Sequence, residues 1–437
     1  MKKSLRAAAL AVLICAVLLL GGCMPGTFDD SLYRLPRLPA EYESLETLID
    51  ALLDGGAEYA APTSGSNLQS VQMVDLNGDG EEEAVACFRR AGDDRPMKIY
   101  IFRTVEDSYT QYCVLEGTSS SIYSLNYVDL NGDGWRELLV GLRGDLDVQN
   151  LAVYSVAAAQ PQQLLVTGYS RYTAQDLDGD GMQDLVVLRS DEESSAVADY
   201  YSWDGAELAL HTSLRLSGTV AELGRITAGT LVGGSRALYI TSVAEDNVAL
   251  MDIVTAQDGA LRSVKNGTSG ERFRFLELYP GDVNGDGVTE APEPEPFPQL
   301  DPDAAVYYRI RWRQYDAAGD SAVVRETYQD TQSGWSLALP ESWDRNVTVS
   351  HAVSANGSSV TFSRIDTPEP APFLTIHAFT GYNRTALASR SGRILLSRQA
   401  EVTYAAELYD ESAGLIDEQT LRESFSVIAA EWTTGEN

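Results

Sequence analysis

Four nine-residue segments share a pattern of acidic residues that could hold a metal ion. The pattern is an acid, any residue, Asn or Asp, Gly, Asp, Gly, two further residues and an acid, and it begins at Asp75, Asp129, Asp176 and Asp282. A hard cation such as Ca²⁺ takes six to eight oxygen ligands at about 2.3–2.6 Å, and closely spaced carboxylates in one tight turn can supply them. We therefore expect about four structural calcium sites.

The roles within each loop follow from alternation along the turn. Positions 1, 3 and 5 direct side-chain oxygens inward, and glycine at position 6 permits the positive φ of the sharp turn. Position 7 offers a backbone carbonyl, and the acid at position 9 completes the shell directly or through water. The expected ligands are Asp75, Asn77, Asp79, Glu81 and Glu83; Asp129, Asn131, Asp133, Trp135 and Glu137; Asp176, Asp178, Asp180, Met182 and Asp184; and Asp282, Asn284, Asp286, Val288 and Glu290.

The surroundings of the loops exclude an EF-hand. That motif needs a glutamate at position 12 and flanking helices, whereas position 12 is Ala86, Val140 or Val187 in the first three loops, and in the fourth it is Glu293 between two prolines. Short β-prone runs such as 84–88 follow the loops, which indicates strands. An Asp/Asn/Gly-rich turn without metal is the alternative interpretation.

The spacing of the loops indicates a structural repeat of about 50 residues. Successive loops start 54, 47 and 106 residues apart, so one repeat lacks the acidic pattern. Residues 226–240 fill this gap, because they keep turn glycines and a following apolar run but no acids. We expect a unit of the same architecture there, and a metal at this unit is doubtful.

The order of strand, acidic loop and strand at this spacing resembles the FG-GAP and VCBS repeats of integrin-type β-propellers. The resemblance implies a mainly β fold, with a five-bladed calcium-binding β-propeller over residues 68–333. Each loop would join the last strand of one blade to the first strand of the next. The fifth blade lacks a closing strand of its own, so the run Gln69–Asp75 is expected to complete it and close the ring. A six-bladed ring and an open array are the alternatives.

Two segments beside the repeats carry recognisable patterns. Within 41–67, apolar residues at helical spacing predict a short helix packed on the propeller, with Ser44 as its cap and Gly55 at its end. Five prolines between Glu290 and Asp303 favour an extended, irregular first edge of the fifth blade that cannot pair regularly.

The remaining region, 334–437, predicts a small α+β C-terminal domain. Strands are expected near 347–349, 360–362, 373–378, 393–396 and 402–407. A final helix is expected after Asp417, with Leu421, Phe425, Ile428 and Trp432 on one face. Residues 336–343, Ser-Leu-Ala-Leu-Pro-Glu-Ser-Trp, weakly resemble the opening of PsbP-like domains, and this likeness brings no catalytic residues.

The N-terminus has the layout of an export signal. Three cations, Lys2, Lys3 and Arg6, precede an apolar run from Ala7 to Leu20 that is shorter than the roughly 20 residues a spanning helix needs. The following Leu-Gly-Gly-Cys23 resembles the bacterial lipobox. It implies a signal peptide over 1–22, a lipid on Cys23, a tether over 23–40 and anchoring to the outer face of the bacterial cell membrane. An ordinary signal peptide with an incidental cysteine is the alternative.

Charge and cysteine content restrict the partners and the cross-links. The formal net charge of −32 excludes nucleic acid as a natural partner, because phosphates would be repelled. Cys87 and Cys113 fall on the first and third strands of one expected blade, so a whole strand separates them. We expect both to be free, packed thiols.

No catalytic constellation stands out. His211, His351 and His377 have no metal-ligand spacing, and no nucleophile elbow or phosphate-binding loop is present. We therefore expect a non-catalytic surface module for binding, adhesion or envelope interaction, with an unknown extracellular glycan, peptide or protein as partner. The alternative is a surface hydrolase or lyase that acts on glycans through the loop face. Exposed aromatics such as Trp135, Tyr200, Tyr201 and Trp203 could stack on sugars, although packing between blades explains them better.

Overall fold

The computed structural model describes residues 42–119, 121–143, 149–268, 273–303, 305–343 and 346–428. The predicted signal peptide, the predicted lipidation site Cys23 and the whole of the predicted tether lie outside these ranges. Within them, no helix is both long and apolar enough to cross a membrane.

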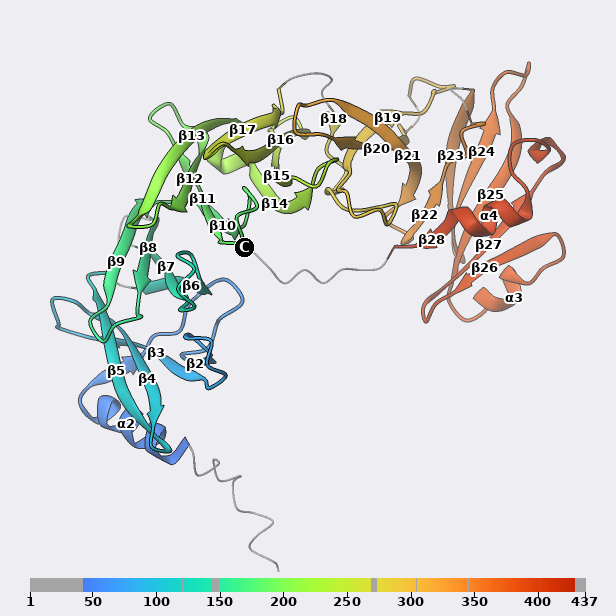
Figure 1. Ribbon diagram of the computed structural model, residues 1–437. Coiled ribbons are helices and arrows are strands. Elements are labelled where there is room, and N and C mark those ends of the chain that lie inside the picture. The colour runs from blue at the N-terminus through green and yellow to red at the C-terminus, as the bar shows by residue number, and fades with distance from the viewer. Residues whose placement is uncertain are drawn as a thin grey trace, which may run out of the picture.

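The protein is mainly β, and the strands of the described residues form six antiparallel sheets that follow one another along an arch (Figure 1). In each of the first four sheets, consecutive strands pair with their neighbours in a simple meander. In these four sheets, the first strand of the meander lies on the concave side of the arch, and the last strand lies on the convex side (Figure 1).

The first sheet carries one short additional strand. β1 (Ala57–Tyr59) and β2 (Val71–Val74) both pair with β3, each along a different part of it. The other strands of the first two sheets are β3 (Glu83–Arg90), β4 (Met97–Val105) and β5 (Ser108–Gly117), and then β6 (Ser121–Val128), β7 (Glu137–Arg143), β8 (Gln149–Ser155) and β9 (Gln162–Gly168).

The third and fourth sheets repeat the same meander. Their strands are β10 (Arg171–Gln175), β11 (Asp184–Ser190), β12 (Ser195–Trp203) and β13 (Leu208–Thr219), and then β14 (Leu223–Thr230), β15 (Arg236–Val243), β16 (Val248–Gln257) and β17 (Ala260–Lys265), with β18 (Phe273–Arg274) on β16; a 3₁₀ turn, η3 (Val220–Glu222), joins the two sheets.

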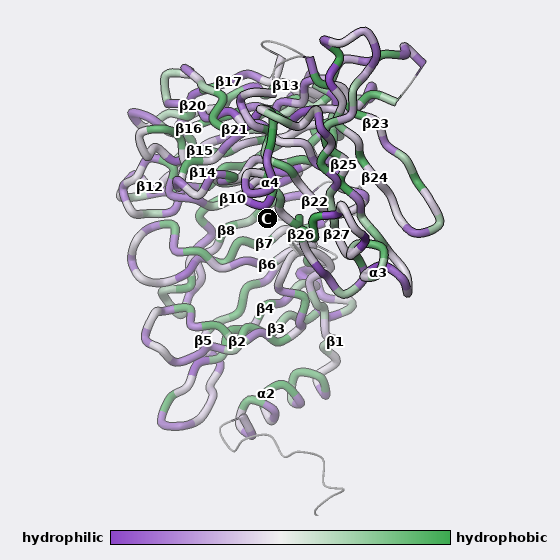
Figure 2. Tube along the Cα trace, turned by 90° about the vertical axis from the view of Figure 1, so that its right-hand side faces the viewer, coloured by the Kyte–Doolittle hydropathy of each residue, from purple (hydrophilic) through white to green (hydrophobic). Residues whose placement is uncertain are grey.

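In the first four sheets, the strand that follows the first strand of the meander (β3, β7, β11 or β15) is apolar on both faces because both faces of the sheet are covered, in the first sheet by a helix and a sheet and in the others by two sheets. Val85 and Cys87 of β3 pack with Leu138 and Val140 of the second sheet, whereas Leu139 faces the third sheet. The same alternation continues into the third and fourth sheets. This explains why these strands read as continuous apolar runs rather than as alternating ones. Figure 2 shows the strand layers stacked above the N-terminal helix.

That helix, α2 (Glu43–Asp54), covers the outer face of the first sheet. Leu45 and Ile49 pack on Phe88 and Phe102, which point away from the second sheet. The helix was predicted, but Ser44 does not cap it. The helix begins at Glu43, and the Ser44 hydroxyl instead accepts a hydrogen bond from the backbone N–H of Tyr109 (2.8 Å). Gly55 follows the last turn as expected.

Two expectations about the repeat are wrong. The acidic loops do not connect neighbouring blades: each of the first three lies inside one sheet, between its first long strand and the next, as in β2–β3. The N-terminal strand does not complete the fifth sheet either, because β2 pairs with β3 of the first sheet. The face of the first sheet that a closed ring would need is occupied by α2.

The fifth sheet has a closing strand of its own, contrary to expectation. Residues that were predicted to open the C-terminal domain form β22, which pairs with β21, and β28 then extends this edge. The strands are β19 (Ala291–Pro296), β20 (Tyr308–Tyr315), β21 (Ser321–Asp330), β22 (Trp335–Ala338) and β28 (Phe425–Val427).

The proline-rich strand β19 is extended and lies at a sheet edge, as predicted, but its pairing is regular. All six of its residues align with β20. Pro292, Pro294 and Pro296 occupy alternate positions, so their missing N–H groups all fall on the side away from β20. An edge strand tolerates this arrangement, which the prediction of irregular pairing overlooked.

The sixth sheet packs on the fifth through a shared core that includes Trp335, Trp343, Phe362 and Phe373. All five predicted strands of this region are present: β23 (Val347–Ser354), β24 (Gly357–Arg364), β25 (Ala371–Thr380), β26 (Arg393–Arg398) and β27 (Val402–Leu408), with helix α3 (Arg384–Ala388) and a 3₁₀ turn, η4 (Asp410–Ser412).

The last predicted helix is shorter than expected. Asp417 caps α4 (Glu418–Ser424) by accepting the backbone N–H of Thr420 (2.8 Å), and Leu421 is buried as predicted. Phe425 belongs to β28 instead, because it pairs there with Leu337 of the fifth sheet. Ile428 follows that strand, and Trp432 lies outside the described residues.

Cys87 and Cys113 are free and buried, as predicted. They lie on β3 and β5, with β4 between them. Burial raises the pKa of both thiols to about 12, which makes them unreactive.

Candidate functional site

All four acidic loops have the same backbone, built around the aspartate at position 1. In the second loop, the two carboxylate oxygens of Asp129 accept the backbone N–H groups of Gly132 (2.8 Å) and Gly134 (3.1 Å). Asp75, Asp176 and Asp282 make the same pair of bonds. The glycines at positions 4 and 6 have positive φ, 71° and 85° for Gly132 and Gly134, so both need a residue without a Cβ. We expected this role for the glycine at position 6 but not for the glycine at position 4.

Positions 3, 5 and 7 form two successive side-chain turns. Asn131 Oδ1 accepts the N–H of Asp133 (2.9 Å), and Asp133 Oδ1 accepts the N–H of Trp135 (2.8 Å). The other loops repeat these contacts. The carboxylate at position 5 is exposed in every loop.

The acid at position 9 is the buried member of each set. It opens the strand after the loop in the first three sheets, and its carboxylate accepts the backbone N–H of position 2, for example Glu137 from Leu130 (2.9 Å). Burial raises the pKa of Glu137 to about 7 and that of Asp184 to about 6, with the loop aspartates adding to the effect. The pKa values of Glu83 and Glu290 are raised for the same reason. A nearby cation favours the charged form of such a carboxyl.

Carboxylate oxygens converge most closely in the third and fourth loops. Those of Asp176, Asp178 and Asp184 lie within 4.8 Å of one another, as do those of Asp282, Asp286 and Glu290. The residue at position 3 is asparagine in the first, second and fourth loops, and in the first two its amide nitrogen lies between two carboxylates. Asn77 Nδ2, for example, is 2.9 Å from Asp79 and 3.1 Å from Glu83.

A second contact distinguishes the fourth loop. Gln314 of β20 donates through Nε2 to Asp286 Oδ2 and Glu290 Oε1, both at 2.7 Å. The loop is thereby joined to β20, the second strand of the fifth sheet. Its donor set differs from that of the third loop, where Asp178 brings an additional negative charge.

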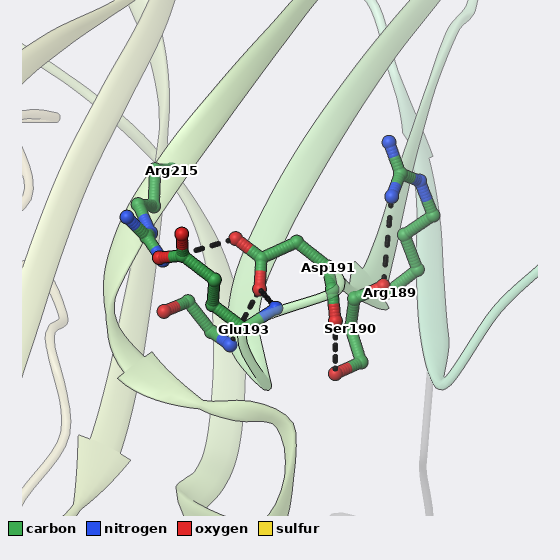
Figure 3. Close-up of polar contacts among 6 residues, drawn as sticks. Arg189, Ser190, Asp191, Glu193 and Arg215 are labelled. Carbon is green, nitrogen blue, oxygen red and sulfur yellow. Dashed lines mark hydrogen bonds and ion pairs between the residues drawn. The ribbon is translucent and has the colours of Figure 1, made fainter.

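Another aspartate turn shows how this chain neutralises an acid where no metal is expected. At the β11–β12 turn, Asp191 Oδ1 accepts the N–H groups of Glu193 (2.9 Å) and Ser195 (2.8 Å), and Arg215 lies 3.2 Å from its other oxygen (Figure 3). Within the described part of the chain, no ion pair to Lys, Arg or His is found for the acids of the four loops. The loop carboxylates therefore gather negative charge with no counter-ion among the described side chains.

The unit without acids has the expected architecture. β14 and β15 form the corresponding hairpin of the fourth sheet, with Leu231 buried as Leu76 and Leu130 are in the loops. By strand register, Thr230 takes position 1 and Ala237 takes the place of the buried acid, and the connection is one residue shorter.

The acidic loops of neighbouring sheets touch. The backbone N–H of Arg136 in the second loop donates to the carbonyl of Leu76 in the first (2.7 Å). A Cβ at Gly132 would lie 3.2 Å from the sulfur of Met182 in the third loop. The first three loops therefore form one continuous edge of the arch.

A polar groove on the concave side is the feature that the sequence did not reveal. Two cavities, of about 170 and 380 Å³, adjoin there and share Asn126 and Tyr172. The Tyr127 hydroxyl donates to Gln72 (2.7 Å) and Asn126 donates to the Tyr172 hydroxyl (2.6 Å), so hydrogen bonds link the first strands of three sheets. We call this the concave groove; its principal side chains are Gln72, Tyr123, Asn126, Tyr127, Arg171 and Tyr172. The sequence indicates this groove only through the polar residues of β2, β6 and β10, and these residues become neighbours only when the sheets stack.

The aromatic residues that could stack on sugars do not line the concave groove. Tyr200 and Tyr201 are buried between sheets, so packing explains them. Trp135 is partly buried and stacks on Tyr112, with ring centroids 5.9 Å apart.

No protein-family model matches the chain.

Proposed function

We propose that the four acidic loops bind Ca²⁺ and that the ions stiffen a non-catalytic surface-binding module. The observation that carries this proposal is the set of loop carboxylates, which share one backbone geometry, include a buried acid and have no cationic partner among the described side chains. Oxygen donors in such numbers suit a hard cation. The side chains at positions 1, 3, 5 and 9 and the carbonyl at position 7 would be the ligands.

Calcium would act on the binding surface through the strands that the loops connect. In each of the first three sheets, the loop joins the strand that lines the concave groove to the buried strand behind it. Fixing this connection would hold Gln72, Asn126 and Tyr172 in their mutual positions. The side chains of the groove offer hydroxyl, amide and aromatic groups, which suit a glycan, a peptide or a protein loop.

We further propose that the repeat is of the FG-GAP/VCBS kind and that its five blade-like sheets form an open array. The four-stranded meanders and their face-to-face stacking support this assignment. With lipid on Cys23, the module would be displayed on the outer face of the bacterial cell membrane. Weak calcium sites of the extracellular type would then be filled after export.

Thermal unfolding with and without calcium tests the ion. For the chain from residue 24 onward, each site with a Kd of about 0.1–1 mM should add about 1–2 kcal/mol at 5 mM Ca²⁺. The unfolding midpoint should therefore rise by several degrees relative to EDTA. Magnesium at equal ionic strength is the control. A rise below about 2 °C would contradict four structural sites.

Retention of envelope components tests the binding function. Protein immobilised with calcium should retain a component of the organism's own envelope, and both a chelator and Tyr172→Ala should reduce this retention. Tyr382→Ala is the matched control, because Tyr382 is 99 % exposed and belongs to the sixth-sheet region. Equal retention by all three proteins would contradict the concave groove as the site. Turnover of purified glycans would favour a surface enzyme instead.

A further inference from the structure

A further pocket lies at the junction of the fourth and fifth sheets; the strands β17 and β20 that border it are near the top of the arch in Figure 1. It has a volume of about 410 Å³ and is formed by the end of β17 and by strands β19 to β21. Its lining includes Lys265, Glu293, Arg311, Arg313, Tyr315 and Ser321. None of these residues belongs to the acidic loops or to the concave groove.

The pocket is cationic in a strongly acidic chain. Three basic side chains surround the carboxylate of Glu293, which has only 8 % of its side chain exposed. Arg313 Nε lies 2.8 Å from Glu293, while Lys265 and Arg311 lie 3.5 and 3.7 Å from it. The Tyr315 hydroxyl also donates to Glu293 (3.1 Å). Among the side chains that line the pocket, one acid thus meets three basic groups, and a second acid outside the lining, Glu295, lies 3.6 Å from Arg311.

Arg311 is the least satisfied of the three basic groups. Its Nε is buried and has no hydrogen-bond partner among the residues that the structure describes. Its outer nitrogens lie 3.7 Å from Glu293 and 3.6 Å from Glu295, beyond hydrogen-bonding distance. The side chain is 21 % exposed, so its guanidinium remains accessible from the pocket. A guanidinium presents a fork of donors that matches a carboxylate or another oxyanion.

Lys265 adds to the unbalanced charge. Its side chain is only 15 % exposed, and its ammonium lies over the Tyr315 ring, 5.4 Å from the centroid. Burial lowers the pKa of Lys265, and the positive charge of Arg313 acts in the same direction, against the attraction of Glu293. A second anion beside Lys265 and Arg311 would relieve this repulsion.

The pocket and the fourth acidic loop lie on opposite faces of β20. Arg311, Arg313 and Tyr315 alternate along the strand towards the pocket, whereas Gln314 points to the other side and contacts Asp286 and Glu290. An anion in the pocket would therefore not compete with a cation in the loop.

We propose that this pocket binds a single oxyanion group, either a carboxylate or a sulfate, between Lys265 and Arg311. A long polyanion would be repelled by the acidic surface, so the ligand is a small anion or one acidic group on an otherwise neutral molecule. Ser321 and Tyr315 provide neutral polar groups beside the anion. This site does not depend on the proposed calcium loops.

Calorimetric titration of the calcium-loaded chain from residue 24, at fixed ionic strength in chloride buffer, tests the site. The probes are sodium sulfate and sodium glucuronate, with glucose as the neutral control. At least one anion should bind with a Kd below about 10 mM, which corresponds to about 2.7 kcal/mol, and glucose should not bind. Tighter glucuronate indicates a carboxylate ligand, and tighter sulfate indicates a tetrahedral one. Absence of binding by both anions overturns the proposal.

Two substitutions assign any binding to the pocket. Arg311→Gln should weaken the bound anion at least tenfold, and Arg311→Lys should weaken it less. Arg89→Gln is the matched control, since Arg89 pairs with Glu58 on the surface of the first sheet. If Arg311→Gln does not fold, Lys265→Met carries the same test, with circular dichroism confirming its fold. Unchanged affinity in the folded variant overturns the assignment.

Discussion

The second and fourth sheets contain the same hairpin with opposite chemistry at its tip. In the second sheet, Asp129 fixes the turn and Glu137 is buried where the next strand begins. In the fourth sheet, Thr230 and Ala237 occupy these places, and Leu231 keeps the buried position of Leu130. The hairpin therefore does not need acids in order to form. Buried Leu and the packing of the sheets provide the architecture, which indicates that the acids serve another purpose.

Placing an acid in the acid-free hairpin should have the largest effect. Ala237→Glu introduces a carboxylate at a position that is 1 % exposed and packed against Tyr239 and Ile253. An uncompensated buried charge should lower the free energy of unfolding by about 3–5 kcal/mol, and calcium should not restore it because positions 3 and 5 lack acids. Urea unfolding measures the change.

Thr230→Asp is the control for that experiment, because Thr230 is only partly buried and the new charge would reach water. It should cost much less than Ala237→Glu. A calcium-dependent rescue of Ala237→Glu would show that the shorter hairpin can still build a site, and would remove the distinction between the two sheets.

Removing the central aspartate of a loop should have the next largest effect. Asp129→Ala deletes two charge-assisted hydrogen bonds to Gly132 and Gly134 together with one proposed calcium ligand. We expect a loss of about 2–4 kcal/mol in calcium, measured by urea unfolding. Thr230→Ala, at the same position of the fourth sheet, should cost less than about 1 kcal/mol. Equal losses would mean that the acidic loop contributes no special stability.

Exchanging one oxygen donor should tune affinity rather than stability. Asp178→Asn makes the third loop resemble the first two and should weaken its calcium binding about tenfold, or about 1.4 kcal/mol. Asn77→Asp should strengthen the first loop by a similar factor. Competition with a fluorescent chelator reports both changes. Shifts in the same direction for the two substitutions would contradict a charge-based ranking of the loops.

The smallest effect is expected at the aspartate turn that carries its own counter-ion. Arg215→Gln removes the cation beside Asp191 and Glu193 on an exposed surface. Because exposed ion pairs contribute little, the unfolding midpoint should move by less than about 1 °C, and by the same amount in calcium and in EDTA. A calcium-dependent shift would show that this turn also responds to the ion.

Local chemistry was predictable from the sequence, whereas strand partners were not. The loops, the strands after them and the five C-terminal strands follow from residue patterns that act over ten residues or fewer, and the unit at 226–240 follows from the 106-residue interval between the third and fourth loops. Whether each loop lies inside one sheet or between two sheets cannot be read from such patterns, because both arrangements give the order strand, turn, strand. Only the three-dimensional pairing of Val74 with Glu83 shows that the first loop lies inside one sheet.

The errors at the ends of the array have related causes. The pairing of β2 within the first sheet and the position of α2 depend on which apolar surface is nearest after folding, and local residue patterns do not reveal that distance. Phe425 lies at helical spacing from Leu421 yet joins β28, because tertiary pairing with Leu337 prevails over the local pattern. The concave groove and the cationic pocket were missed for the same reason, since their residues come from different sheets.

The helix on the first sheet and the unrelated sheet on the fifth have a consequence for how such chains can change. A circular arrangement fixes the number of its modules, since adding one alters every angle. Here each end of the array is covered by an element that differs from the repeat, helix α2 at the first sheet and the sixth sheet at the fifth. A whole four-stranded sheet could therefore be gained or lost in the middle of the array while the two covering elements stay unchanged, so the number of sheets can vary in evolution.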